Sequence, residues 1–184
     1  MDDLSKEQIL ELCKKYDREE DQWNSSLEKQ LGNKFRISKE MSKEDLIEVV
    51  KWKFATNPHR LKRELNLIEK LDDIAIRQFS KLAFDTDNEV TRITYLRKIK
   101  GIGLAVASAI LTFFDPKNYG VFDIHIYDEL FDTNPKTRPK DISQNPGLYI
   151  KLLEKLRQTA SKYNLDVRTV EKALFKKNYD KSRH

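Results

Sequence analysis

Residues Leu96–Phe114 read LRKIKGIGLAVASAILTFF, and Val121–His125 shortly after them read VFDIH. Gly101 and Gly103 separate two apolar patterns with helical spacing, which is typical of a tight hairpin between two helices. Glycine adopts backbone conformations that other residues avoid, and its missing Cβ lets another backbone come close. We therefore predict two helices joined by a short turn within residues 92–114.

The start of the second of these helices is a candidate anion site. The first turn of a helix presents amides that have no partner within the helix, and such amides commonly bind phosphate. Here they would be the amides of Ile102, Gly103 and Leu104, with Lys98 and Lys100 adding positive charge just before the turn. The alternative is that both lysines are solvated surface side chains. The pattern favours a DNA backbone phosphate as the ligand.

The order Gly-Ile-Gly, then Ala107–Leu111, then Asp123 resembles the helix-hairpin-helix–Gly/Pro/Asp superfamily of DNA glycosylases. The spacing from Gly103 to Asp123 is similar to that of the adenine-DNA glycosylases. The triplet Asp-Ile-His is similar to the Asp-Val-His of the 8-oxoguanine glycosylases. The resemblance spans residues 92–130, and it implies an all-α, glycosylase-like fold with a helix-hairpin-helix motif and double-stranded DNA as the partner.

Asp123 is the candidate catalytic residue under this resemblance. A carboxylate beside C1′ can stabilise the positive charge that develops on the sugar as the N-glycosidic bond breaks, and it can orient or deprotonate a water. The base must first be flipped out of the duplex. Asp is also a favoured helix N-cap, and Asp123 precedes a predicted helix. The two roles can coexist.

Two further positions refine what the resemblance implies. Bifunctional members of the superfamily place a lysine two residues after the second hairpin glycine, where this chain has Ala105. The resemblance therefore implies a monofunctional glycosylase that does not nick the strand by β-elimination. It also implies that His125 contacts the DNA backbone, although an ordinary exposed or capping histidine is an equal alternative.

Trp52, Phe54 and Arg60, with His59 beside them, form a possible base pocket. Aromatic rings next to basic groups can stack on an extruded base. The alternative, which the density of aromatics favours, is that Trp52 and Phe54 are buried helix residues. A pocket that contained both Trp52 and Asp123 would reverse this preference.

Metal and cofactor chemistry has little support in the sequence. The single cysteine, Cys13, excludes an internal disulfide, a cysteine-ligated cluster and a cysteine-rich zinc site within one chain. The three histidines are far apart in sequence, so no metal site of an enzyme is expected and no cofactor is predicted. The resemblance does allow a monovalent cation held by backbone carbonyls at the hairpin.

Composition and periodicity predict a single all-α unit over residues 1–184, whose helices could form two lobes with a cleft. Ser42 and Asn57–Pro58 are predicted helix starts. Residues 17–40 are weakly patterned, so we expect the segment 1–40 to be peripheral. No apolar run approaches ~18 residues, and the polar N-terminus is unlike a signal peptide. We therefore expect no membrane association and a cytoplasmic protein, nucleoid-associated if bacterial.

Positive charge is concentrated after residue 50. Residues 1–50 hold 9 basic and 13 acidic residues, so the remaining 134 carry +9 of a total net charge of +5. The runs 51–63 and 91–100 lack acids, and the second leads into the hairpin. Such clusters suit a polyanion, although lysine and arginine can also simply solvate helix faces.

These observations support three hypotheses. The first is a DNA-binding protein of base excision repair, a monofunctional glycosylase that hydrolyses the N-glycosidic bond of a damaged or mismatched base. The second is a non-catalytic helix-hairpin-helix module that binds DNA. The third is a helical protein-interaction domain with no role in nucleic-acid binding. A pocket walled by Asp123 with room for one base would favour the first.

Overall fold

The computed structural model describes residues 4–19 and 22–181, and over these residues it is all-α, with ten helices and no strand. The predicted all-α class is confirmed. The helices are α1 (Lys6–Glu19), α2 (Gln22–Ser38), α3 (Lys43–Lys53), α4 (Pro58–Ile68), α5 (Asp73–Asp85), α6 (Glu89–Lys98), α7 (Leu104–Phe114), α8 (Ile124–Phe131), α9 (Pro146–Tyr163) and α10 (Val167–Lys181).

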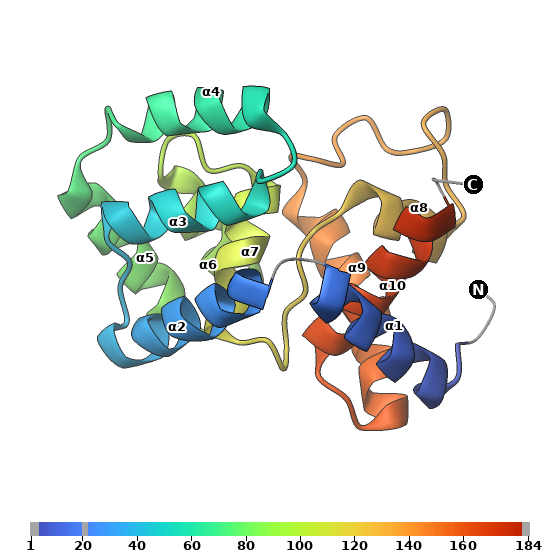
Figure 1. The fold of residues 1–184 in the computed structure, drawn as a ribbon. Helices are drawn as coiled ribbons and strands as arrows, with labels where there is room; N and C mark the ends of the chain where they lie inside the picture. Colours follow the sequence, from blue (N-terminus) through green and yellow to red (C-terminus); the bar gives the residue numbers. More distant parts are fainter. Residues whose placement is uncertain (1–3, 20–21, 182–184) are drawn as a thin grey trace.

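The helices lie in two groups (Figure 1). Helices α2 to α7 form one group, and α8 to α10 form the other together with α1, which packs along α10. The groups meet where α6 packs on α9 and where α1 contacts α2. Helix α7 is the centre of the first group, and nearly all of its side chains are buried. The segment 115–123 carries the chain from α7 into the second group.

The predicted helix starts at Ser42 and Asn57 are confirmed. The Ser42 hydroxyl accepts from the Asp45 N–H at 3.3 Å, and the Asp45 carboxylate accepts from the Ser42 N–H at 3.0 Å, which is a capping box. The Asn57 side chain accepts from the Arg60 N–H at 3.1 Å, and Pro58 occupies the first helical position. These caps fix where α3 and α4 begin.

The described part of residues 1–40 is not peripheral, contrary to expectation. Ile9 on α1 and Phe35 on α2 are fully buried in the core. Leu27, Leu31 and Phe35 recur every four residues, so they form one narrow stripe along α2. This narrow stripe is enough to bury one face of α2 because Gly32 lets α2 and α7 come close together. A Cβ at Gly32 would lie 2.2 Å from the carbonyl oxygen of Phe113.

An ion pair joins the two groups where α6 meets α9. Arg157 on α9 donates from Nη1 to Oε2 of Glu89, the first residue of α6, at 3.0 Å. The same guanidinium donates from Nε to the carbonyl oxygen of Asn118, also at 3.0 Å. The hydrogen bond from Arg157 lowers the pKa of Glu89, while partial burial of the carboxylate opposes the shift. Ionised Glu89 therefore stabilises the folded state.

Replacing Arg157 with Met should destabilise the protein in a pH-dependent way. Because the pKa of Glu89 is lower in the folded state, its contribution is present above the ordinary glutamate value of 4.5 and is lost as the pH falls through the folded value. Urea unfolding at neutral pH should show a loss of about 1 kcal/mol, and the gap from wild type should narrow in acid. Lys155→Met, at an exposed position of the same helix, is the control. A gap that stays constant with pH would contradict this assignment.

Candidate functional site

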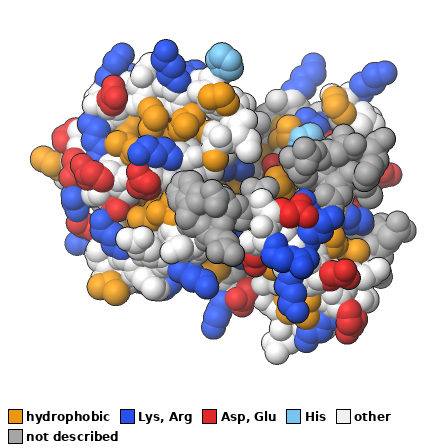
Figure 2. All heavy atoms as spheres, in the orientation of Figure 1, with side chains coloured by type: hydrophobic (Ala, Val, Ile, Leu, Met, Phe, Trp, Pro, Cys, Tyr) orange, Lys and Arg blue, Asp and Glu red, His pale blue; other side chains and the backbone are white. Residues whose placement is uncertain are grey.

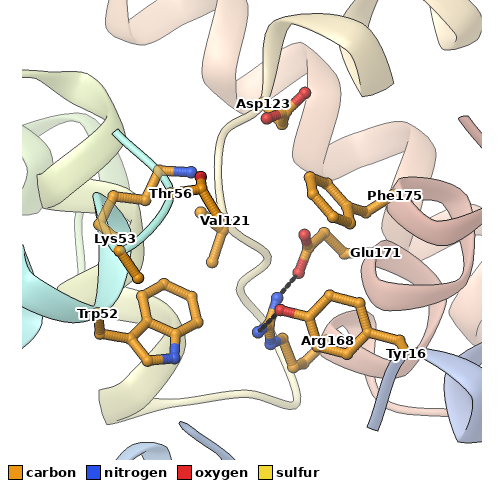
Figure 3. Close-up of a pocket in the computed structure, with 10 residues that line it drawn as sticks. Tyr16, Trp52, Lys53, Thr56, Val121, Asp123, Arg168, Glu171 and Phe175 are labelled. Atoms are coloured by element: carbon orange, nitrogen blue, oxygen red, sulfur yellow. Dashed lines mark hydrogen bonds and ion pairs between the residues drawn. The ribbon is translucent and has the colours of Figure 1, made fainter. Parts of the chain in front are cut away.

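A cavity of about 250 Å³ lies between the two helix groups (Figure 3). One wall is formed by helix α3 and the residues after it. The other walls are formed by α1, α10 and the segment that leads into α8. It is lined by Tyr16, Trp52, Lys53, Ala55, Thr56, Val121, Asp123, Arg168, Glu171 and Phe175. The cavity therefore brings together residues that are far apart in the sequence, and Asp123 is among them.

Helix α7 positions the segment that carries Asp123. The Ser108 hydroxyl accepts from the Phe122 N–H at 2.8 Å and donates to the carbonyl oxygen of Ala105 at 2.9 Å. On the other side, the buried Tyr149 hydroxyl donates to the carbonyl oxygen of Gly120 at 2.8 Å. The chain is therefore held on both sides just before Asp123, and the carboxylate reaches the cavity from a fixed position.

Asp123 is the N-cap of α8, as predicted. Its Oδ1 accepts from the His125 N–H at 2.8 Å, and the side chain is half-buried at the cavity wall. Within the described residues no further hydrogen bond or ion pair engages this carboxylate. One oxygen therefore orients the group, and the second is available to a ligand. The catalytic role of Asp123 stays a prediction.

Aromatic rings face the cavity from both helix groups. Trp52 lies on the α3 side, and Tyr16 and Phe175 lie across from it (Figure 3). Each is held by an edge-to-face contact: Trp52 on Phe113 at 5.0 Å between ring centroids, and Tyr16 on Phe175 at 5.8 Å. The rings therefore line opposite sides of the cavity, and aromatic rings are suitable partners for a planar ligand.

A buried ion-pair cluster lies at one end of the cavity. Arg168 on α10 donates to both carboxylate oxygens of Glu28 on α2, at 2.7 and 3.1 Å, and it also pairs with Glu171 one turn along α10. Its guanidinium lies 5.5 Å from the Tyr16 ring and 5.4 Å from the Trp52 ring. Burial raises the pKa of Glu171, although Arg168 opposes this; burial acts to lower the pKa of Arg168, but the carboxylates outweigh it.

Lys53 is a cavity residue that was not predicted from the sequence. It is the last residue of α3, its side chain is half-buried, and its amine points toward the segment that holds Val121 and Asp123 (Figure 3). Burial lowers the pKa of Lys53, while Asp123 and Glu171 act to raise it. The one signal in the sequence was its place directly after Trp52 in a run without acids.

Of the three residues of the predicted base pocket, Trp52 lines the cavity, whereas Phe54 and Arg60 do not. The guanidinium of Arg60 instead lies over the Phe54 ring, 4.4 Å from its centroid, and neither side chain lines the cavity. Phe54 is the C-cap of α3, and its side chain is buried in the core. The interpretation of Phe54 as a buried helix residue is the one that fits.

Five residues, 99–103, connect α6 and α7. Gly101 has φ +89°, a conformation that favours glycine, whereas Gly103 has φ −85° and could accommodate another residue. A Cβ at Gly103 would meet no atom within 4 Å, and Gly103 caps α7 without any side-chain acceptor. Gly103 therefore leaves open space in front of the helix start.

Of the other predicted DNA contacts, Lys98 ends α6, Lys100 lies in the connection, and His125 lies on α8. Lys98, Lys100 and His125 are exposed, whereas the side chains of Ile102 and Leu104 are buried, so that only their backbone amides could serve a ligand. None of these residues lines the cavity. The connection and the cavity are linked through α7, because Ser108 lies little more than one turn from the start of that helix.

Comparison with known proteins gives no further guide: no family model, curated protein or solved structure matches this chain. Among the residues that the structure describes, no three His, Cys, Asp or Glu side chains are grouped so as to hold a metal ion. None of the described helices is both long and apolar enough to span a membrane. Any functional conclusion therefore depends on the geometry of the site.

Arg168→Met should destabilise the protein by about 3–5 kcal/mol, because it leaves the buried carboxylate of Glu171 and the partly buried carboxylate of Glu28 without their partner. The triple variant with Glu28→Gln and Glu171→Gln should recover part of this loss, since no buried charge is then uncompensated. Urea unfolding of both variants tests the prediction. Equal stability of the single and triple variants would mean that the charges of Glu28 and Glu171 are not held by Arg168.

Proposed function

We propose that this chain is a DNA-binding protein of base excision repair, a DNA glycosylase that hydrolyses the N-glycosidic bond of a damaged or mismatched base. The observation that supports the proposal most is the position of Asp123, which borders a cavity with aromatic walls. At about 250 Å³ the cavity is just below the range of about 300–1,000 Å³ for drug-sized ligands, a size that suits a single base.

In the proposed mechanism, the target base leaves the duplex and enters the cavity between Trp52 and the opposing rings of Tyr16 and Phe175. Stacking on aromatic side chains contributes about 1–3 kcal/mol per base, which offsets part of the cost of unstacking. The sugar would then lie at the cavity mouth beside Asp123. Because the His125 N–H holds one carboxylate oxygen, the other can stabilise the cationic sugar or deprotonate the attacking water.

The connection between α6 and α7 would bind the DNA backbone in this proposal. The amides at the start of α7, in the open space beside Gly103, suit a phosphate oxygen. Lys98 and Lys100 would add positive charge, and His125 would donate a hydrogen bond to the DNA backbone. A monovalent cation held by carbonyls of this turn remains a prediction from the resemblance.

A non-catalytic DNA-binding module is the second candidate. It is favoured by the same open space at Gly103, because a backbone contact there requires no cavity and no carboxylate. The two functions differ in one readout. A glycosylase produces abasic DNA from a duplex with a lesion, whereas a binding module retains the duplex unchanged.

Asp123→Asn should reduce base excision by about 10²–10⁴-fold, since asparagine cannot act as a base or supply negative charge. Asparagine caps helices as well as aspartate does, so the fold should be retained. The measurement is release of base from duplexes that each carry one of a panel of lesions. Asp132→Asn, at the exposed left-handed C-cap of α8, changes the same charge as a control. Undiminished excision by the Asp123 variant would contradict the proposal.

Lys98→Ala with Lys100→Ala should weaken binding to duplex DNA and reduce its salt dependence. Each phosphate contact contributes about 0.9 to the slope of log K against log salt, so the double variant should lose about 1.8. Lys151→Ala with Lys155→Ala, exposed on α9, removes the same charge elsewhere. Fluorescence anisotropy over a salt series measures both slopes. The same change in both variants would show that binding follows net charge alone.

A further inference from the structure

We propose that Lys53 is a nucleophile that adds to C1′ of an abasic deoxyribose, which gives the pocket a lyase activity on abasic DNA. The inference rests on the proposed function, because an abasic sugar is the product that base excision leaves in this pocket. It adds a second reaction at the same site, carried by a residue that has no part in the hydrolysis proposed above.

The placement of Lys53 is the first support. Lys53 is the last residue of α3, and it lines the cavity on the same side as Trp52. Asp123 lines the same cavity from the segment opposite, and the amine points toward that segment (Figure 3). A sugar that lies at Asp123 after base release would therefore be within the space that the Lys53 side chain can sweep.

The second support is that this amine is not held in an ion pair. Lys51, two residues earlier, pairs with Glu48 at 2.8 Å, and Lys172 pairs with Asp17 at 2.8 Å. For Lys53 no hydrogen bond and no ion pair within 4.0 Å links it to any described residue. An amine that is directed into a cavity and has no fixed partner remains available to react.

The electrostatic environment is compatible with a nucleophilic amine. Burial lowers the pKa of Lys53 from its ordinary value of 10.5, and Arg168 and Arg60 act in the same direction. The carboxylates of Asp123 and Glu171 oppose the shift. A lysine that is partly desolvated has a larger neutral fraction near neutral pH, and the neutral amine is the form that attacks a carbonyl.

The chemistry needs no oxidant, reductant or cofactor. The amine of Lys53 adds to the C1′ aldehyde of the ring-opened sugar, and loss of one water gives a protonated imine. Asp123 removes a proton from C2′, and the electron pair moves to expel the 3′ phosphate, which breaks the C3′–O bond. Water then hydrolyses the imine, so that the amine is regenerated and an unsaturated aldehyde remains on the 3′ end of the nicked strand.

This activity differs from what the sequence resemblance implied. Ala105 at the hairpin position removes the lysine that bifunctional relatives use, and that observation predicts no strand nicking. The prediction concerns one position only. In the folded protein, the amine of Lys53 reaches the cavity from α3, whereas Asp123 lines it from the segment that leads into α8.

Borohydride trapping on a duplex with one preformed abasic site tests the proposal. Borohydride reduces the imine to a stable amine, so wild-type protein should form a covalent complex with the DNA. Peptide mapping by mass spectrometry should locate the attachment at Lys53. Lys53→Gln should form no complex, and Lys51→Gln, at an exposed position of the same helix, should form it as wild type does.

The mapping of the wild-type adduct decides the question even if Lys53→Gln does not fold. Attachment at Lys98, Lys100 or another amine would overturn the proposal, as would the absence of any adduct. The preformed site bypasses base excision, which separates the two proposals. Excision from a lesion duplex without an adduct overturns the lyase alone. An adduct at Lys53 without excision from any lesion supports the lyase and contradicts the glycosylase.

Discussion

The site depends on the ion pairs of the buried Arg168 guanidinium. This guanidinium belongs to α10, but it pairs with Glu28 on α2 in the other helix group as well as with Glu171 on its own helix. A charge in the interior is very costly unless it is paired and hydrogen-bonded, and separating the groups here would break the pair between Arg168 and Glu28. The cavity between the groups is therefore pre-formed, with its aromatic walls at fixed positions, before any ligand arrives.

Helix α7 imposes the second constraint. It begins at the open space beside Gly103, and little more than one turn later Ser108 holds the segment that ends at Asp123. At its other end, Arg36 donates to the carbonyl oxygens of Phe113 and Phe114, at 3.2 and 2.8 Å. If a backbone phosphate binds at the start of α7, this helix would position it relative to the segment that carries Asp123, and such positioning of reacting groups favours catalysis.

Local sequence signals predicted most of the helices, and the features that were missed depend on tertiary contacts. The caps at Ser42, Asn57 and Asp123 involve partners within three residues, so the sequence shows them directly. The core position of α2 was missed because its stripe is only one residue wide and depends on Gly32 meeting α7. Arg168, Glu171 and Lys53 were missed because charged residues on helices are usually solvated, and only the assembled fold shows them facing one cavity.

The central claim is that an everted base occupies the cavity beside Asp123. A crystal structure of the Asp123→Asn variant with a duplex that carries a lesion tests this most directly. The account predicts the extruded base between Trp52 and the rings of Tyr16 and Phe175, its sugar against residue 123, and a neighbouring phosphate at the start of α7. A fully stacked duplex bound on the outer surface, with no nucleotide in the cavity, would contradict it.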